Sequence, residues 1–443
     1  MRLPERPPKF PKLLEKIGPQ RWAELLLNHR LDPTGPYCHW DELKFRDPPE
    51  GLTHEEWWSV IQTSRLSQRR LVPLRDGQGE LFSYCLTDEI LALTQFIDQQ
   101  AAGQIEADAA VNTPDTRDRY IISSLIEEAT TSSQLEGAAT TRRVASEMLR
   151  SGRAPRDKSE QMIFSNFAAM QLIRSWRSES VTPARILELH RVLTEGTLDD
   201  GDAGRLQKEG EKRVHVSHHD GTVLHTPPPA AQLDERLILL CRFANGELDD
   251  NRFIPRVVRA VILHFWLAYD HPFVDGNGRT ARALFYWAML REGYWLAEFV
   301  SISRILRKAQ AQYRDAFLLV ETDNNDLTYF VLHQLRVFRQ AIDDLAAYLK
   351  RKAQEIREVE RKLKRAALLN HRQHALVAHA LRHPTFTYTI ESHRRSHSIA
   401  YGTARSDLYE LRDRGLLRQT QSRGRATTFE PHPEIERRLE RLR

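Results

Sequence analysis

The stretch HPFVDGNGRTAR, residues 271–282, lies between two segments with the spacing of buried helices. Before it, residues 255–269 are almost wholly apolar, which predicts a helix buried on most of its sides. After it, apolar residues recur at helical spacing from Ala281 until Gly293, a residue type that commonly ends helices. The sequence therefore predicts a mainly α-helical domain in which a short loop joins two packed helices.

The second half of this loop has the residue types of an anion site. Gly276, Asn277 and Gly278 allow a sharp turn with successive exposed N–H groups, and the following helix adds the positive end of its dipole. Arg279 and Arg282 are three residues apart on one helical face, where both can contact phosphate oxygens.

Two further residues make the loop chemically specific. Asp275 offers the hard oxygen ligand that Mg²⁺ takes alongside phosphates. His271 is a base whose ordinary pKa lies near neutrality, so it can accept a hydroxyl proton. A lone histidine or a lone GxG is usually structural, but a base, a metal carboxylate, an anion nest and two arginines together predict phosphoryl or nucleotidyl transfer.

The same stretch resembles the signature of the Fic family, HxFx[D/E]GNGRxxR, at every defining position. The resemblance, which covers roughly residues 113–347, implies an all-helical core. It implies that AMP is transferred from Mg-ATP to a Ser, Thr or Tyr hydroxyl of a target protein. The implied roles are His271 as base, Phe273 packing the loop, Asp275 holding Mg²⁺, Gly276, Asn277 and Gly278 cradling the α and β phosphates, Arg279 contacting the β phosphate and Arg282 the γ phosphate.

Two alternatives to AMP transfer stay open. Some Fic relatives transfer UMP, a phosphate or phosphocholine, and the signature does not fix the nucleobase. The candidate positions for an adenine pocket are Tyr294, Tyr313 and Asn324. The other alternative is a nucleotide-sensing DNA-binding regulator, although an intact His271 favours an enzyme.

Upstream, residues 121–137 read IISSLIEEATTSSQLEG and predict a helix that Gly137 ends. Glu136 lies at its C-terminus, where the helix dipole opposes a carboxylate by about 0.3 to 1 kcal/mol, so a cationic partner is expected. SSQLEG resembles the Fic inhibitory motif [S/T]xxxE[G/N], with Ser132, Glu136 and Gly137 at matching positions. The resemblance implies self-inhibition, in which Glu136 pairs with Arg282; in some relatives the same glutamate supports AMP removal.

Residues 211–229 are the one clear interruption of the helical pattern. Val214, Val216 and Val223 alternate around Asp220-Gly221, which predicts a small β-hairpin. This hairpin is similar in position to the flap that in Fic proteins contacts the incoming target segment.

The C-terminal residues 370–443 hold 14 basic against 8 acidic residues, a charge of +6 in a chain of net charge +5, which suggests a polyanion partner. A helix at 371–381, a TFTYTI strand, a helix capped by Thr403 and a hairpin at 418–430 resemble a winged helix, with Arg423 to Arg425 at the wing. DNA binding is one prediction for this domain, and protein contacts or dimer formation are the alternative.

With 443 residues, of which 41% are hydrophobic, the chain should form two or three domains. The expected division is an N-terminal α+β extension (1–110), a Fic core (111–347), a helical linker (348–369) and a winged helix (370–443). Without an apolar run of about 18 residues or a signal peptide, a soluble cytoplasmic protein is expected. The three cysteines lack disulfide or zinc spacing, and a homodimer is suggested only by the family resemblance.

Overall fold

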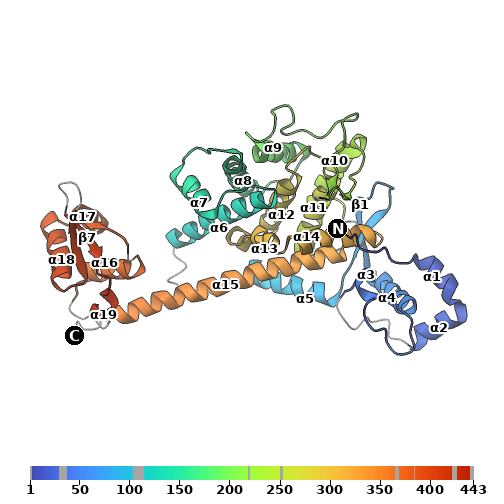
Figure 1. The fold of residues 1–443 in the computed structure, drawn as a ribbon, viewed down its shortest axis with the longest axis horizontal. Helices are drawn as coiled ribbons and strands as arrows, with labels where there is room; N and C mark the ends of the chain where they lie inside the picture. Colours follow the sequence, from blue (N-terminus) through green and yellow to red (C-terminus); the bar gives the residue numbers. More distant parts are fainter. Residues whose placement is uncertain are drawn as a thin grey trace. The chain divides into compact units, whose positions relative to one another are not determined.

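The computed structural model describes residues 2–28, 37–102, 114–217, 220–249, 253–364, 369–383, 385–421 and 427–439. The chain divides into two compact units, one of residues 1–106 and 114–345 and one of residues 107–113 and 346–443. The described part is mainly helical with three small antiparallel sheets, which confirms the predicted fold class (Figure 1). None of its helices combines the length and apolar character needed to cross a membrane.

The first unit begins with an α+β segment. Its elements are α1 (Phe10–Ile17), α2 (Pro19–Asn28), α3 (Trp40–Leu43), α4 (His54–Gln68), β1 (Arg69–Arg75) and β2 (Leu81–Cys85). The strands pair antiparallel around Asp76, whose Oδ1 accepts the N–H groups of Gln78 and Glu80. The Ser83 N–H donates to the Asn325 carbonyl at 3.1 Å, so the extension is joined to the helical core within one unit.

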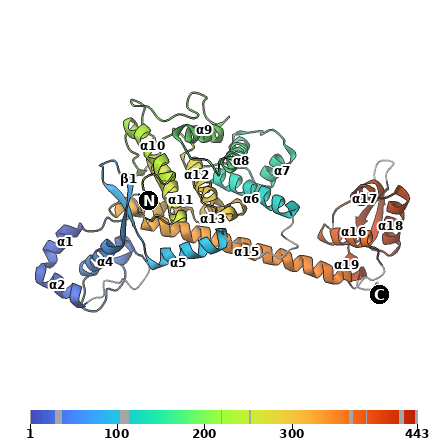
Figure 2. The same cartoon turned by 180° about the vertical axis from the view of Figure 1, so that it is seen from behind.

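The rest of this unit is built mainly of helices around one hydrophobic core. In Figures 1 and 2, α5 runs beside the first half of α15, and Arg336 on α15 forms an ion pair with Glu89 on α5. The elements are α5 (Asp88–Ile97), η1 (Asp98–Ala102), α6 (Pro114–Leu135), α7 (Arg142–Ser151), α8 (Lys158–Ser175), α9 (Pro183–Thr194), β3 (Val216–Ser217), β4 (Val223–His225), η2 (Ala230–Gln232), α10 (Leu233–Ala244), α11 (Arg256–Asp270), α12 (Asn277–Arg291), η3 (Trp295–Phe299), α13 (Ile302–Lys308), α14 (Gln310–Thr322) and α15 (Thr328–Lys364).

Helix α11 is the central element of this core. All of its residues except Arg256 and Ala268 are buried, as its apolar sequence predicts. It packs against α12, and the loop between the two helices is therefore held on a rigid base.

Helix α6 differs in extent from the predicted helix at 121–137. It spans Pro114–Leu135, and Glu136 lies in the turn beyond its end, where Gly137 adopts a φ of 95°. The helix is fixed to the core through the buried carboxylate of Glu128, which accepts hydrogen bonds from the Tyr286 hydroxyl (2.9 Å) and the Ser303 N–H (3.1 Å). The end that carries Glu136 is therefore an anchored one.

The predicted hairpin after α9 is confirmed, since β3 pairs antiparallel with β4. Side chains of this segment bind the carbonyl groups at the end of α11. Arg213 donates to the Asp270 carbonyl (2.8 Å) and the His271 carbonyl (3.2 Å), and His225 Nε2 lies 2.6 Å from the Tyr269 carbonyl oxygen. The base of the hairpin is thereby tied to the loop that starts at His271.

The second unit contains a three-stranded sheet of order β5-β7-β6 packed with helices over its own hydrophobic core. The long helix α15 runs from the first unit into the second and covers residues 348–364 of the helical linker expected at 348–369. The remaining elements are α16 (His371–Arg382), β5 (Tyr388–Thr389), α17 (Ile390–His397), α18 (Tyr401–Asp413), β6 (Leu417–Gln421), β7 (Thr427–Pro431) and α19 (Ile435–Leu439).

Three details of this unit differ from the prediction. The TFTYTI segment contributes only a two-residue strand, because α17, which the sequence analysis missed, begins at Ile390. Helix α18 starts at Tyr401 with Ala400 in the N-cap position, so the Thr403 cap was wrong and Thr403 lies inside the helix. Arg423 to Arg425 lie outside the described residues.

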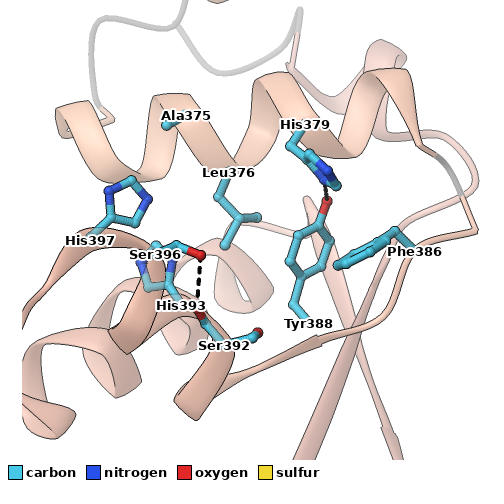
Figure 3. A pocket seen from close by; sticks show the side chains of 9 residues that line it. All are labelled: Ala375, Leu376, His379, Phe386, Tyr388, Ser392, His393, Ser396 and His397. Carbon is cyan, nitrogen blue, oxygen red and sulfur yellow. Dashed lines mark hydrogen bonds between the residues drawn. The ribbon is translucent and has the colours of Figure 1, made fainter. Parts of the chain in front are cut away.

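A cavity of about 250 Å³ lies between α16 and α17 (Figure 3). Its lining includes Leu376, Phe386 and three histidines, and His379 Nδ1 lies 2.7 Å from the Tyr388 hydroxyl. The cavity is lined by imidazole, hydroxyl and apolar groups and by no arginine, so its lining does not have the charge of a polyanion site.

Candidate active site

His271 lies where α11 ends, in a conformation that sets the direction of the loop. It adopts a left-handed φ of 45° as the C-cap residue, and its N–H donates to the Leu267 carbonyl. Its Nδ1 is 3.4 Å from the Ala268 carbonyl oxygen, an acceptor, so the proton belongs on Nδ1 and the lone pair on Nε2. Burial, with a smaller contribution from His225, lowers the pKa of His271 to about 4, so the ring is neutral at pH 7.

Asn277 closes the loop through its side chain. Its Oδ1 accepts the Phe273 N–H (2.9 Å) and its Nδ2 donates to the Phe273 carbonyl (2.8 Å). Phe273 is fully buried and stacks on the His190 ring, with centroids 3.7 Å apart and an interplanar angle of 6°. The Asn277 side chain is thus used within the loop, which leaves only its backbone N–H to face an anion.

The start of α12 forms an open anion nest. Gly276 has a φ of 82°, and a Cβ there would lie 2.9 Å from Thr194 Cγ2, so only glycine fits. No side chain caps the helix, which leaves its first N–H groups facing outward with the positive dipole end. The Asp275 side chain is 51% exposed, and its Oδ1 accepts the Gly276 N–H at 2.6 Å.

Arg279 is buried beside this nest with unused donors. Its Nη1 donates to the Leu193 carbonyl (2.8 Å), whereas its buried Nε and Nη2 meet no hydrogen-bond partner among the described residues. The Asp275 carboxylate is 3.7 Å from Nη2, beyond hydrogen-bond distance. Buried guanidinium donors are almost always paired, so this arrangement fits an anionic group bound against Arg279.

The buried Arg282 contacts Ser132 and Glu136, which precede it by 150 and 146 residues in the sequence. Arg282 is 2% exposed; it donates from Nε to the Ser132 hydroxyl (2.9 Å) and from Nη2 to the Ser132 carbonyl (3.0 Å) and the Glu136 carboxylate (2.8 Å). Burial alone would lower the pKa of Arg282, but Glu136, Tyr313 and Glu128 together outweigh it and the pKa is raised.

The Glu136 carboxylate also lies against the anion nest. A Cβ placed on Gly278 would be 2.2 Å from Glu136 Oε1 and 3.0 Å from Arg282 Nη1. The carboxylate is therefore in contact with the backbone at the N-terminus of α12 and with an arginine at once. These are the partners that a phosphate group would use.

The three positions considered for an adenine pocket are dispersed. Tyr313 lies beside Arg282, its hydroxyl 2.8 Å from His264 Nε2, and burial raises its pKa to about 12. Tyr294 is buried and bonded to Asp98. Asn324 lines a different cavity of about 420 Å³ with residues of the N-terminal segment. Only Tyr313 is near the nest.

Three supporting residues were missed by the sequence analysis, namely His190, Arg213 and His225. Their sequence context is that of ordinary residues on a helix face or in a polar hairpin, so no local signal could have identified them. Across the described residues, no group of three or more His, Cys, Asp or Glu side chains is arranged to hold a metal ion.

Residues 180–289 match the model of the Fic/DOC family. Over 131 residues the chain is 32% identical to "Protein adenylyltransferase Fic" of Culex quinquefasciatus, covering 29% of this chain and 24% of that protein. Over 109 residues it is 36% identical to "Protein adenylyltransferase fic-1" of Caenorhabditis elegans, covering 25% and 19%. The chain therefore spans about a quarter or less of the length of these two curated relatives.

A solved Fic family protein from Desulfovibrio desulfuricans G20 has a similar fold, with a TM-score of 0.52 and 18% identity, covering 79% of this chain and 98% of that one. The match to the family model contains α9, the hairpin, α11, the signature loop and most of α12, whereas α6 and Glu136 precede it. Residues 180–289 of this chain form a Fic domain.

Proposed function

We propose that this Fic domain is a protein adenylyltransferase that moves AMP from Mg-ATP to a hydroxyl group of a target protein, and that Glu136 restrains it. AMP transfer is supported as the reaction class by the two curated relatives, which are named protein adenylyltransferases. The observation that carries the proposal is the Glu136 carboxylate, which contacts both Gly278 and Arg282 in the position of an anion at the start of α12. A carboxylate there competes with a terminal phosphate of the nucleotide.

The residues at the nest fit a nucleoside triphosphate with its metal ion. The free Arg279 donors and the uncapped N–H groups of α12 suit the phosphates, and the exposed Asp275 carboxylate would hold Mg²⁺. Bound Mg²⁺ would neutralise phosphate charge. His271, neutral and with its Nε2 lone pair free of the Ala268 contact, would accept the proton of the target hydroxyl.

A panel of labelled nucleotides tests the proposal. We expect the Glu136→Gly variant, incubated with Mg²⁺, to label itself from [α-³²P]ATP more strongly than from [α-³²P]UTP, CTP or GTP. No label should come from [γ-³²P]ATP, because AMP transfer keeps the α phosphate and releases the other two. Label from [γ-³²P]ATP would identify a phosphate transferase, and label from UTP alone a UMP transferase. No label from any nucleotide would reject nucleotidyl transfer.

The order of elements in the second unit and the side chains on α18 favour a second function, DNA binding. Its order of helix, strand, two helices and two strands is that of a winged helix, in which the second helix of the pair enters the DNA major groove. On α18, which would be that helix, Arg405 and Arg412 flank the Tyr409 ring at 5.0 Å and 4.4 Å. We propose that this face binds duplex DNA through its phosphates.

Fluorescence anisotropy of the full chain with duplex DNA at increasing salt tests this second proposal. Binding should weaken as salt rises, and Arg405→Ala should weaken it further while reducing the salt slope by about one, the effect of one lost phosphate contact. The control is Arg437→Ala on α19, an exposed arginine paired with Glu434. Absence of binding even at low salt would exclude DNA and leave protein contacts as the use of this unit.

A further inference from the structure

We infer that His190 is a positioning residue for the nucleotide site, which acts as a fixed neutral imidazole that holds the Asp275 carbonyl and so sets the phosphate-binding loop. This inference rests on the proposed function for its link to catalysis. His190 and Gly204 lie outside both the signature and the inhibitory motif. His190 belongs to α9, whose residues have no part in the sequence patterns that predicted the site.

Both ring nitrogens of His190 are engaged, and their partners define the tautomer. The Gly204 N–H, a donor, lies 2.9 Å from Nδ1, so Nδ1 must be unprotonated. The Asp275 carbonyl oxygen, an acceptor, lies 2.9 Å from Nε2, so Nε2 must carry the proton. The ring therefore bridges the segment after α9 and the signature loop in one tautomer only.

The surroundings leave the ring no alternative position. His190 is fully buried, and its ring stacks on Phe273 in the signature loop. Gly204 approaches α9 so closely that a Cβ there would lie 2.9 Å from Arg191 Cβ. The ring thus fixes the position of the Asp275 carbonyl relative to a rigid helix, and this carbonyl belongs to the same planar peptide group as the Gly276 N–H.

Helix α9 makes two further contacts with the same site. The Leu193 carbonyl accepts Nη1 of Arg279, and the Thr194 methyl group lies against Gly276. Helix α9 therefore fixes the backbone of Asp275, the turn at Gly276 and the side chain of Arg279. Of the two hydrogen bonds, only that of His190 can be removed by substitution on α9, because the Leu193 acceptor is a backbone carbonyl.

Two substitutions separate the two halves of the His190 bridge. Asn places its amide near the imidazole Nδ1 position and can accept from Gly204 but does not reach Asp275. Gln places its amide near the Nε2 position and can donate to Asp275. Both remove the aromatic ring and its stacking on Phe273, so they are a pair in which His190→Asn keeps only the Gly204 bond and His190→Gln keeps only the Asp275 bond.

The pair is compared in the Glu136→Gly background. We expect His190→Asn to raise the dissociation constant of a non-hydrolysable ATP analogue with Mg²⁺ about tenfold relative to His190→Gln, the effect of one lost hydrogen bond. The KM for ATP should rise with it, while kcat changes little because His271 is untouched. Equal binding and equal KM for the two variants would overturn the inference.

Two readouts do not depend on the proposed reaction. Hydrogen exchange at Gly276 to Gly278 without nucleotide should be faster in His190→Asn than in His190→Gln, even if neither binds ATP. If both variants unfold, ¹⁵N–¹H spectra of the histidine-labelled wild-type chain decide the matter. They should show His190 as the Nε2–H tautomer, and an Nδ1–H tautomer would refute the inference.

Discussion

Replacing Glu136 with glycine is expected to raise AMP incorporation about 10- to 100-fold. In the resting site the Glu136 carboxylate binds Arg282 at 2.8 Å and lies against Gly278. Removing it frees one donor of Arg282 and the start of α12 for a phosphate. The factor corresponds to about 1.4 to 2.8 kcal/mol, within the range measured for close charge pairs.

The activation should lower folding stability without unfolding the chain, because Arg282 keeps two of its three acceptors, the hydroxyl and carbonyl of Ser132. Losing one hydrogen bond to a charged group lowers the free energy of unfolding by about 1.5 to 3 kcal/mol. Self-labelling with [α-³²P]ATP and Mg²⁺, together with a melting temperature, measures both effects.

Two control variants separate charge from general disturbance of α6. Glu136→Gln removes the charge but keeps a side chain over Gly278, so it should activate less than Glu136→Gly. Glu127→Ala alters the same helix at a carboxylate that pairs with Arg142, 2.5 Å away, and should not activate at all. Equal labelling by wild type and Glu136→Gly would remove the restraint from the proposal.

Adding His271→Ala to the Glu136→Gly variant is expected to lower AMP transfer by about 10²- to 10⁴-fold, the usual contribution of a general base. Nucleotide affinity should change little, because the nest is formed by Gly276 to Gly278 and Arg279 rather than by the imidazole. Single-turnover rates, with the affinity for the ATP analogue measured in parallel, distinguish these two effects.

The pH dependence of transfer gives an independent check on His271. Since its pKa is lowered to about 4 by burial, the neutral ring predominates above that pH, and kcat/KM should be level from pH 6 to 8. The acid limb should lie near pH 4 to 5. Glu136 favours the imidazolium, so Glu136→Gly should shift the limb further down. A limb near pH 7, or full activity in His271→Ala, would contradict the assigned base.

The loop and its two flanking helices could be predicted because their signals are local. The apolar run before His271, the glycines and asparagine of the turn and the amphipathic repeat after it each act within a few residues, so the α11–loop–α12 arrangement follows from sequence. The hairpin at β3 and β4 was predictable for the same reason, since alternation around Asp220-Gly221 favours a turn.

The second unit shows where local signals fail. The TFTYTI segment has strand propensity, yet its last residue is the first of α17, because Thr389 caps a helix through a capping box with Ser392. Thr403 was expected to cap α18, but the helix starts two residues earlier at Tyr401. Competing caps at close spacing cannot be ranked from sequence, because packing decides which one is used.

By itself the sequence determined the residue types of the nest, the helices on either side and the presence of a glutamate near a helix end, because these depend on spacing along the chain. Only the tertiary structure decided that Glu136 reaches Arg282 and Gly278. It also decided that Nε and Nη2 of Arg279 have no hydrogen-bond partner among the described residues, and that His190 binds the Asp275 carbonyl. The contacts of Glu136 and His190 join residues 85 to 146 positions apart, and their distances are set by how the helices pack rather than by any pattern within one of them.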